Sequence, residues 1–333
     1  MLKPSSLKEL HRKSNLLAFS AGVDSSALFF ILLDNNVAFD IAIVDYGVRE
    51  QSKKEVAYAK ELASKYNLKC HTLTAPPIDK NFESNARKIR YDFFQTLIQT
   101  HNYENLITAH HLGDRFEWML MQFCKGAGCA ELSGMSGIQK RENYTLLRPL
   151  LHLDKQELLE YLHENSLKYF EDESNLDEDI RRNEFRHKHS LPLLQKHLSG
   201  IKKSFEYIDE DVSSLIQELQ VDSINDFAYL TASQNRRANI FNIDKYLKSK
   251  GYMLSASERE MLKSATATTV GRRYIINQTE KFIFIIPDLK DKVILDARFK
   301  DECRVLKIEP KLRSYLARDS EAFSLIKRLL TNV

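Results

Sequence analysis

Residues 16–26 read LLAFSAGVDSS, and the apolar run ALFFILL (residues 27–33) follows directly. The first apolar run is long enough for a buried strand and too short for a helix. Small residues follow it, and they let a ligand approach the backbone closely. Asp24 and Ser25 then stand where helix-capping residues stand, before an apolar helical run. Strand, turn and helix start together aim backbone N–H groups and the positive end of a helix dipole at one point, which predicts a phosphate site.

The phosphate motif in this stretch is neither of the two commonest kinds, because Gly-Lys-Ser/Thr and G-x-G-x-x-G are both missing. Instead, SAGVDS (residues 20–25) resembles the S-G-G-x-D-S signature of the PP-loop ATP pyrophosphatases, which split ATP into AMP and pyrophosphate. Ala21 replaces the first glycine. The resemblance implies that Asp24 helps to hold Mg2+ and that ATP is bound by a loop made of Ser20, Ala21, Gly22, Val23, Asp24 and Ser25. A plain strand-to-helix turn is the alternative reading.

Composition places the chain among globular proteins: of its 333 residues, 43% are hydrophobic and 29% are charged. A net charge of +3 permits an RNA partner without requiring one. No apolar run approaches the roughly 20 residues that span a membrane, and the first 15 residues are polar, so we expect a cytoplasmic protein with no membrane partner. The four cysteines make no C-x-x-C pair and fit zinc spacing poorly, so we expect reduced, partly buried thiols.

Predicted strands and helices alternate along the first part of the chain. We expect strands at 39–49, 68–73 and 105–109, and helices at 50–67 and 83–94. This alternation predicts a doubly wound parallel sheet of the α/β class. Ligands of such sheets sit at the carboxyl ends of the strands, where the loop at Ser20 and the turn at Asp45 both fall.

A basic helix face is predicted within residues 83–94. Arg87 lies three residues before Arg90 and four before Tyr91, so guanidinium groups and an aromatic ring share one side. Planar, permanently charged arginine suits a triphosphate or an adenylate. A solvated helix face is the alternative. The order A-R-x-x-R-Y resembles the PP-loop enzymes, where it lies over ATP, and this favours Arg87 and Arg90 as ATP contacts.

A cluster of one imidazole and two carboxylates is predicted after the strand at 105–109. On a helix, His110 and Asp114 are four residues apart and Asp114 and Glu117 three apart, so they share a face. A zinc site is weakly supported, because H-E-x-x-H is absent. Two carboxylates fit Mg2+ or the ammonium groups of a basic substrate better. Simple stabilisation of the helix N-terminus is the alternative.

The resemblance becomes specific at TAHHLGDRFE (residues 108–117) followed by KGAG (residues 125–128). This segment resembles T-A-H-H-x-D-D-Q-x-E-T…R-G-x-G of the tRNA(Ile)-lysidine synthases. It implies a lysine-binding and catalytic role for His110, Asp114 and Glu117. Gly113 stands in place of the family's first Asp and Arg115 in place of its Gln. The turn VDYGVR (residues 44–49) resembles V-x-H-G-L-R of the same family, with Tyr46 in place of His.

Two further motifs extend the resemblance to about residue 190. LRPLL (residues 147–151) resembles the R-P-L-L element of the family. FEDESNLD (residues 170–177), with Arg182, Asn183 and Arg186 after it, resembles D-x-S-N-x-D…R-N-x-x-R. The resemblance implies a substrate-facing loop in which the tRNA-facing residues are Asp172, Asn175, Arg182, Asn183 and Arg186. A turn-rich acidic loop without function is the alternative.

The character of the chain changes at about residue 200. We expect residues 1–200 to form the PP-loop ATP-binding catalytic domain and residues 201–333 a mainly helical domain with a β-rich C-terminal part. Predicted helices lie at 201–219, 234–250 and 255–264, a hairpin at 274–286 and a strand at 293–295. Basic residues are scattered over this half, and the resemblance implies that it binds tRNA.

Together, these motifs imply an ATP-dependent, C–N bond-forming ligase similar to the tRNA(Ile)-lysidine synthases. The resemblance implies that ATP, with Mg2+, adenylates the C2 oxygen of the wobble cytidine in tRNA(Ile) with a CAU anticodon. Free L-lysine then attacks C2 and releases AMP, leaving lysidine. The sequence leaves open whether the chain is a monomer or a homodimer.

Two alternatives from other classes remain at this point. A 2-thiocytidine-forming PP-loop tRNA thiolase would need cysteines to hold a cluster or pass on sulfur, and no C-x-x-C is present. A catalytically silent tRNA- and nucleotide-binding protein is the other, because Ala21, Tyr46 and Gly113 depart from the family pattern. Turnover of ATP to AMP with tRNA and lysine present would exclude it.

Overall fold

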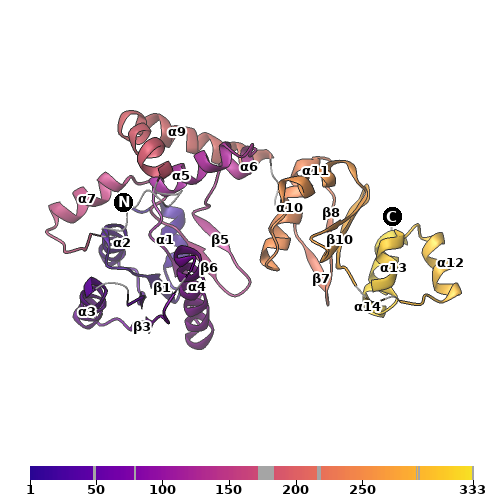
Figure 1. Cartoon of the computed structure of the whole chain (residues 1–333), viewed down its shortest axis with the longest axis horizontal. Helices are drawn as coiled ribbons and strands as arrows, with labels where there is room; N and C mark the ends of the chain where they lie inside the picture. Colours follow the sequence, from indigo (N-terminus) through magenta and orange to yellow (C-terminus); the bar gives the residue numbers. More distant parts are fainter. Residues whose placement is uncertain are drawn as a thin grey trace. The chain divides into compact units, whose positions relative to one another are not determined.

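The computed structural model describes residues 1–47, 50–78, 80–171, 184–215, 219–289, 291 and 293–331. Contacts divide the chain into two compact units, Met1–Asp211 and Val212–Val333, which are described separately (Figure 1). The sequence placed the boundary after residue 200. The boundary lies later because the helix predicted at 201–219 begins earlier, at Leu191, and Phe205 on it packs into the core of the first unit.

The first unit is built on a sheet that has six strands in the described ranges, in the order β3-β2-β1-β4-β6-β5 (Figure 1). The strands are β1 (Asn15–Ala18), β2 (Asp40–Asp45), β3 (Cys70–Thr74), β4 (Asn105–Ile107), β5 (Ile138–Lys140) and β6 (Thr145–Leu147). Neighbouring strands run parallel, except that β5 is antiparallel to β6. Leu16 of β1 pairs with Asp40 on one side and Leu106 on the other. The predicted doubly wound parallel sheet is confirmed.

Helices cover both faces of this sheet. The described helices of this unit are α1 (Pro4–Leu10), α2 (Val23–Asp34), α3 (Glu50–Lys65), α4 (Phe82–His101), α5 (Leu112–Phe123), α6 (Cys129–Leu132), α7 (Lys155–Glu164), the π-helix η2 (Arg186–Ser190) and α9 (Leu191–Leu215). Alternate strand residues point to opposite faces: Leu17 lies in the core that α2, α3 and α7 cover, and Leu16 in the core that α4 covers. This alternation buries both faces, as a parallel sheet requires.

The strand order reverses direction between β1 and β4. From β1 the chain moves outward through β2 and β3, and it then returns to the other side of β1 to form β4 and β6. Such a reversal leaves a crevice outside the carboxyl ends of the two central strands, where ligands of doubly wound sheets bind. The segments that leave this edge are Phe19–Gly22 after β1 and Thr108–His111 after β4.

The second unit is built on an antiparallel sheet with five strands among its described residues, in the order β7-β8-β11-β10-β9. The strands are β7 (Asp222–Ile224), β8 (Phe227–Thr231), β9 (Ala267–Val270), β10 (Tyr274–Gln278) and β11 (Phe282–Pro287). The helices are α10 (Arg236–Ser249), α11 (Ala256–Ser264), α12 (Ala297–Val305), α13 (Pro310–Leu316) and α14 (Ser320–Thr331). The predicted helices at 234–250 and 255–264 and the hairpin at 274–286 are confirmed.

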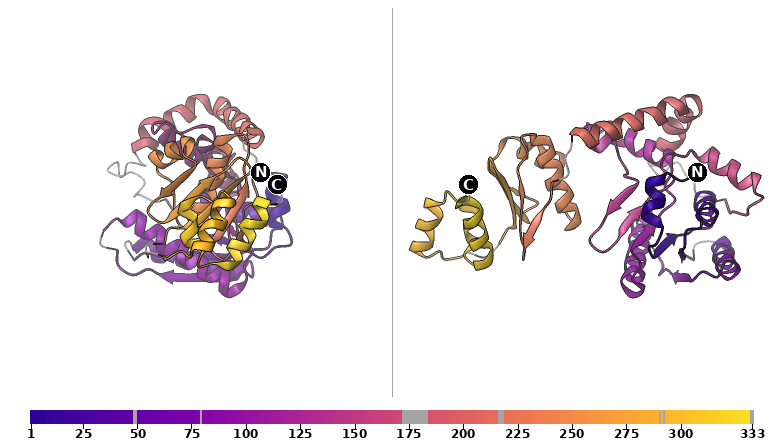
Figure 2. Two further views of the ribbon diagram at one scale, coloured as in Figure 1. Left: turned by 90° about the vertical axis from the view of Figure 1, so that its right-hand side faces the viewer. Right: turned by 180° about the vertical axis from the view of Figure 1, so that it is seen from behind.

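Both faces of this second sheet are buried. Ile283 and Ile285 of β11 pack under α10 and α11, and Phe284 and Ile286 pack under α12–α14 (Figures 1 and 2). The strand predicted at 293–295 is wrong: these residues form no strand, and Ile294 is fully exposed. The predicted β-rich C-terminal part therefore ends with β11 at Pro287, and the described elements after it are the helices α12–α14. Across the described residues, no helix combines the length and the apolar character that membrane crossing needs.

Candidate functional site

The loop Phe19–Gly22 joins β1 to α2 at the reversal point of the sheet. The Ser25 side chain stabilises this loop. The Ser20 backbone N–H donates to Ser25 Oγ at 3.2 Å, and the two serine hydroxyls lie 3.0 Å apart. Ala21 is fully buried and takes a left-handed conformation with φ of 60°. For a residue with a Cβ this conformation costs about 1–2 kcal/mol. The loop is therefore held in a shape that glycine would adopt more readily than alanine.

Helix α2 begins directly from this loop. Gly22 is its N-cap, with extended backbone, and Asp24 lies in the first turn, so the prediction that Asp24 and Ser25 cap the helix is wrong. Among the described residues, no side chain caps the N-terminus of this helix. The first N–H groups of a helix have no intrahelical acceptor and carry the positive end of its dipole. Gly22 and Asp24 therefore offer their N–H groups to an anion, whereas the Val23 N–H faces the Phe170 carbonyl across a parallel bridge.

The Asp24 carboxylate lies beside these N–H groups. Its Oδ1 is buried and has no hydrogen-bond partner among the residues the structure describes. Burial, followed by the nearby charge of Asp114, raises the pKa of Asp24, while His111 opposes the shift. A buried carboxylate oxygen without a partner is the donor that a hard cation needs. Within the described ranges no cluster of three or more metal-ligating side chains occurs, so a cation on Asp24 would take its other ligands from phosphate and water.

His111 lies between two carboxylates. Its Nε2 is 3.8 Å from Asp24 Oδ2 and 3.7 Å from Asp114 Oδ2. Its Nδ1 accepts a hydrogen bond from the Gly113 backbone N–H at 3.0 Å, so in the neutral ring the proton is on Nε2, facing both carboxylates. The sequence analysis selected His110, which instead pairs with Thr108 at 2.9 Å. The signal for His111 was its place three residues before Asp114, as the N-cap of α5 in a capping box.

Gly113 is part of the same arrangement. A Cβ at this position would lie 2.6 Å from His111 Cε1. The family's usual Asp could therefore not be accommodated here with His111 in this position. Gly113 and the His111 ring position depend on each other.

Asp114 and Glu117 both contact Arg186. Arg186 Nε donates to Glu117 Oε2 at 3.0 Å, and its Nη2 lies 3.5 Å from Asp114 Oδ1. Asp114 also accepts from the His111 backbone N–H at 3.0 Å. Asp114 and Glu117 are both buried. Residues far apart in the sequence thus form one charged cluster, and its two carboxylates are already placed to hold a cationic group.

Arg87 and Arg90 lie on α4, beside the end of β2. The Arg87 guanidinium lies 4.8 Å from the centre of the Tyr91 ring. Tyr46 links the two elements, because its hydroxyl donates to the Ala86 carbonyl at 3.0 Å. Burial raises the pKa of Tyr46, and the charge of Arg90 partly offsets that effect. Tyr46 thus replaces the family's His with a residue that anchors α4.

Arg148 is a residue that the sequence analysis did not select. It follows β6 at the same sheet edge and is buried, with its Nη1 donating to the Ser136 carbonyl at 2.8 Å. Its Nε has no partner in the described part of the chain, and burial lowers the pKa of the guanidinium. The R-P-L-L motif contains Arg148 and could have drawn attention to it. The motif by itself does not indicate that this arginine is buried.

Four of the residues predicted to face tRNA, Asp172, Asn175, Arg182 and Asn183, lie outside the described residues. Arg186 alone of that set can be placed. The four cysteines all lie in described ranges and are free thiols: Cys303 is buried as expected, whereas Cys124 is exposed.

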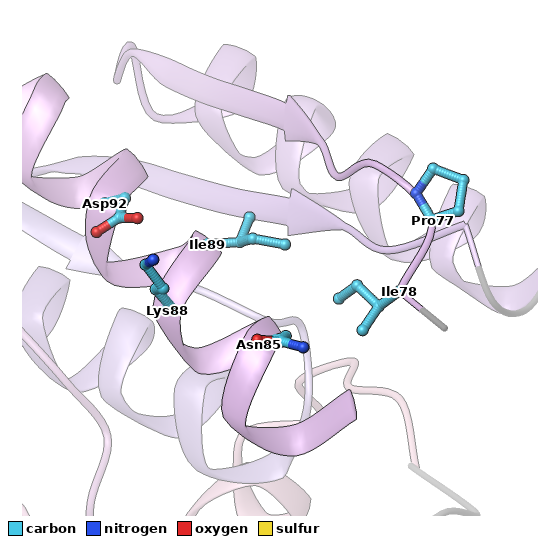
Figure 3. A pocket seen from close by; sticks show the side chains of 6 residues that line it. All are labelled: Pro77, Ile78, Asn85, Lys88, Ile89 and Asp92. Atoms are coloured by element: carbon cyan, nitrogen blue, oxygen red, sulfur yellow. The ribbon is translucent and has the colours of Figure 1, made fainter. Parts of the chain in front are cut away.

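A shallow hollow of about 340 Å³ lies on the other side of α4 (Figure 3). Its lining residues are Pro77, Ile78, Asn85, Lys88, Ile89 and Asp92. The four from α4 follow helical spacing on the side opposite Arg87 and Arg90. The hollow is therefore separate from the site at the sheet edge.

Comparison with known proteins bears on this site. A family described as "PP-loop domain" matches residues 3–192. The tRNA(Ile)-lysidine synthase of Helicobacter pylori is 40% identical over 93% of this chain and 91% of its own length. The enzyme of the same name from Wolinella succinogenes is 41% identical over 92% of this chain and 94% of its own length. Among solved structures, the U34-tRNA thiolase NcsA from Methanococcus maripaludis superimposes with a TM-score of 0.52 at 16% identity, covering 64% of this chain and 78% of that one.

Proposed function

The chain belongs to the tRNA(Ile)-lysidine synthase family of PP-loop enzymes, and from this membership we propose how its own residues carry out the reaction. It is an ATP-dependent ligase that modifies tRNA. The observation that carries the proposal is the pair of carboxylates, from Asp24 and Asp114, that both lie near His111 Nε2. Asp24 belongs to the phosphate loop, and Asp114 belongs to the cluster with Glu117 and Arg186. We assign ATP to the Asp24 side of the site and free L-lysine to the Asp114 side.

On the ATP side, the free N–H groups at the start of α2 bind the phosphates. Arg87 and Arg90 add positive charge from α4, and buried Arg148 adds a third guanidinium at the same sheet edge. Donors fixed in advance stabilise the charge that develops on pyrophosphate as it leaves. Asp24 would hold Mg2+, which supplies charge neutralisation on the phosphates. The C2 oxygen of the wobble cytidine of tRNA(Ile) attacks the α-phosphorus, and the bond to pyrophosphate breaks.

On the lysine side, Asp114 and Glu117 hold and orient the amino acid. The ammonium of lysine and the guanidinium of Arg186 carry the same charge, so lysine competes with Arg186 for these two carboxylates. The lysine ε-amine, once deprotonated, attacks C2 of the adenylated base. The bond from C2 to the oxygen breaks, and AMP leaves with that oxygen.

The second unit is proposed to contact tRNA through its exposed basic residues. Several of its other cations are engaged internally: Lys248 and Arg259 pair with Asp244, and Lys263 pairs with Glu260. Exposed arginines stand at the start of α10 and in the β9–β10 turn; they are Arg236, Arg237, Arg272 and Arg273. Such residues suit phosphate contacts, which position RNA without reading its sequence.

The thiolase alternative has less support. The likeness to the U34-tRNA thiolase is one of fold at 16% identity, whereas lysidine synthases match nearly the whole chain at about 40%.

The test is incorporation of labelled lysine into a tRNA(Ile) transcript with a CAU anticodon, measured together with pyrophosphate release. Lysine incorporated at one per tRNA, dependent on ATP, is expected. Pyrophosphate release without lysine incorporation would point to another nucleophile. If neither pyrophosphate release nor lysine incorporation is detected, the result would support the alternative of a catalytically silent tRNA- and nucleotide-binding protein.

A further inference from the structure

The short segment Lys168–Glu171, here called the strap, crosses the phosphate loop. The Phe170 backbone N–H donates to the Ala21 carbonyl at 2.9 Å, and Phe170 forms a parallel bridge with Gly22. These contacts join residues about 150 positions apart in the sequence. The acceptor is therefore the carbonyl of Ala21, the non-glycine residue of the loop whose backbone is left-handed.

The direction of this bond fixes the direction of a donor in the site. A peptide group is planar and trans, so the Ala21 carbonyl and the Gly22 N–H point in opposite directions. Because the strap holds that carbonyl, the Gly22 N–H faces away from the strap. Gly22 is the N-cap of α2, so this N–H belongs to the group that faces an anion.

Helix α3 holds the strap in place. The Tyr58 hydroxyl donates to the Lys168 carbonyl at 2.8 Å, and the Tyr58 ring packs edge-on against the Phe170 ring at 5.7 Å. The Lys168 ammonium lies over both rings, at 5.0 and 5.2 Å. At the other end, Gln51 Nε2 donates to the Glu171 carbonyl at 2.8 Å. Tyr58 is buried, and burial raises its pKa to about 12, so its hydroxyl remains a donor.

We propose that Tyr58 and Phe170 are positioning residues for ATP: through the strap they hold the Ala21–Gly22 peptide, and with it the left-handed Ala21, in the orientation that binds phosphate. Neither residue need touch ATP. Because alanine resists the left-handed conformation, a loop with alanine at this position needs an outside contact to keep it there. The proposal rests on the ATP site proposed above and adds a reason why Ala21 is tolerated.

The test compares Tyr58→Phe, which removes only the hydroxyl, with Tyr58→Ala, which also removes the ring. KM for ATP in pyrophosphate release is expected to rise about threefold in the first variant and about tenfold in the second, as loss of one to two hydrogen-bond equivalents implies. KM for lysine should stay unchanged. Tyr66→Phe is the matched control, since Tyr66 follows the same helix and makes no strap contact in the described structure.

A second substitution separates positioning from mere support of the fold. Glycine adopts a positive φ without penalty, so Ala21→Gly introduced into Tyr58→Ala should return KM for ATP toward the wild-type value. Its melting temperature need not recover. A KM for ATP that stays unchanged in Tyr58→Ala while the melting temperature falls would overturn the proposal, and so would failure of Ala21→Gly to restore KM. Wild-type protein that releases no pyrophosphate would instead overturn the proposed function.

Discussion

At the scale of single residues, the site contains a carboxylate, Asp24, whose burial lowers the stability of the folded protein when it is ionised. Burial and the charge of Asp114 raise the pKa of Asp24, and its Oδ1 lacks a partner in the described structure. Between the ordinary pKa and the raised one, the folded protein binds more protons than the unfolded chain. Stability therefore falls as pH rises through this window. Asp24 therefore costs the fold stability once it is ionised, as expected for a group that serves a ligand.

Asp24→Asn is accordingly expected to raise the melting temperature of the ligand-free protein at neutral pH and to abolish pyrophosphate release. The gain in melting temperature should shrink as pH falls through the raised pKa, because the wild-type carboxyl is then protonated. Thermal unfolding at several pH values checks the sign. A melting temperature lowered by the substitution at neutral pH would show that the carboxylate stabilises the fold instead.

Gly113→Ala tests the placement of His111. The added Cβ would lie 2.6 Å from the imidazole, so the ring must leave its position between the two carboxylates. We expect pyrophosphate release to slow by up to roughly a hundredfold, as misplacement of a site group by an ångström can cause. Gly200→Ala is the control: nothing lies within 4 Å of its Cβ, and in α9 it should stabilise the protein by about 1 kcal/mol with activity retained. Equal activity in the two variants would mean that the His111 position is unimportant.

At the scale of elements, Arg115 fixes α9 against α5 and α6 within the first unit. Its guanidinium pairs with both carboxylate oxygens of Asp209, donates to the Ser133 carbonyl at 2.9 Å and lies 4.2 Å from the Phe205 ring centre. Arg115 is buried, whereas the Asp209 side chain is about half exposed. This chain therefore uses an arginine, in place of the family's Gln, to join α5, the end of α6 and α9.

Arg115→Gln should lower the free energy of unfolding by about 2 kcal/mol, since it removes charged hydrogen bonds from a buried position. Denaturant unfolding measures the change. Arg304→Gln is the comparison, because its ion pair with Asp301 is exposed on both sides and such pairs contribute little. If both variants lose the same small amount, the Arg115 contacts do not join these elements.

Most of the elements in the first unit could be predicted, because strand and helix signals there are strong and local. The pairing of Ala21 with Phe170, and of Glu117 with Arg186, could not, since nothing in the local sequence records which distant segments meet. Asp24 was mistaken for a cap because residue type alone does not show where helical backbone begins. The apolar triplet at 293–295 looked like a strand, although no neighbouring strand is available to pair with it in the described structure.

At the scale of the whole molecule, the chain combines a catalytic unit with a second unit that has its own buried cores on both faces of its sheet. Charge on a surface identifies no partner by itself, so the tRNA-binding role proposed for the second unit is tested at one defined turn. The β9–β10 turn offers a specific test. Gly271 N–H and the Tyr252 hydroxyl both donate to Glu258, which holds the turn that carries Arg272 and Arg273.

Arg272→Glu combined with Arg273→Glu is expected to raise KM for tRNA by about tenfold or more and to make tRNA binding less sensitive to salt, because phosphate contacts release counterions. KM for ATP should not change. Lys263→Glu is the control, since Lys263 is already engaged with Glu260. An unchanged KM for tRNA in the double variant would remove this turn from the interface.

We have assigned ATP and lysine to two different carboxylates, Asp24 and Asp114, that both lie near His111 Nε2, and Asp114→Ala tests this assignment most directly. The measurement follows pyrophosphate release and labelled lysine incorporation in the same reaction with tRNA(Ile) bearing CAU. The account predicts that the variant still releases pyrophosphate at a substantial fraction of the wild-type rate but incorporates little lysine. Loss of both steps to the same extent would contradict the division of the site into an ATP side and a lysine side.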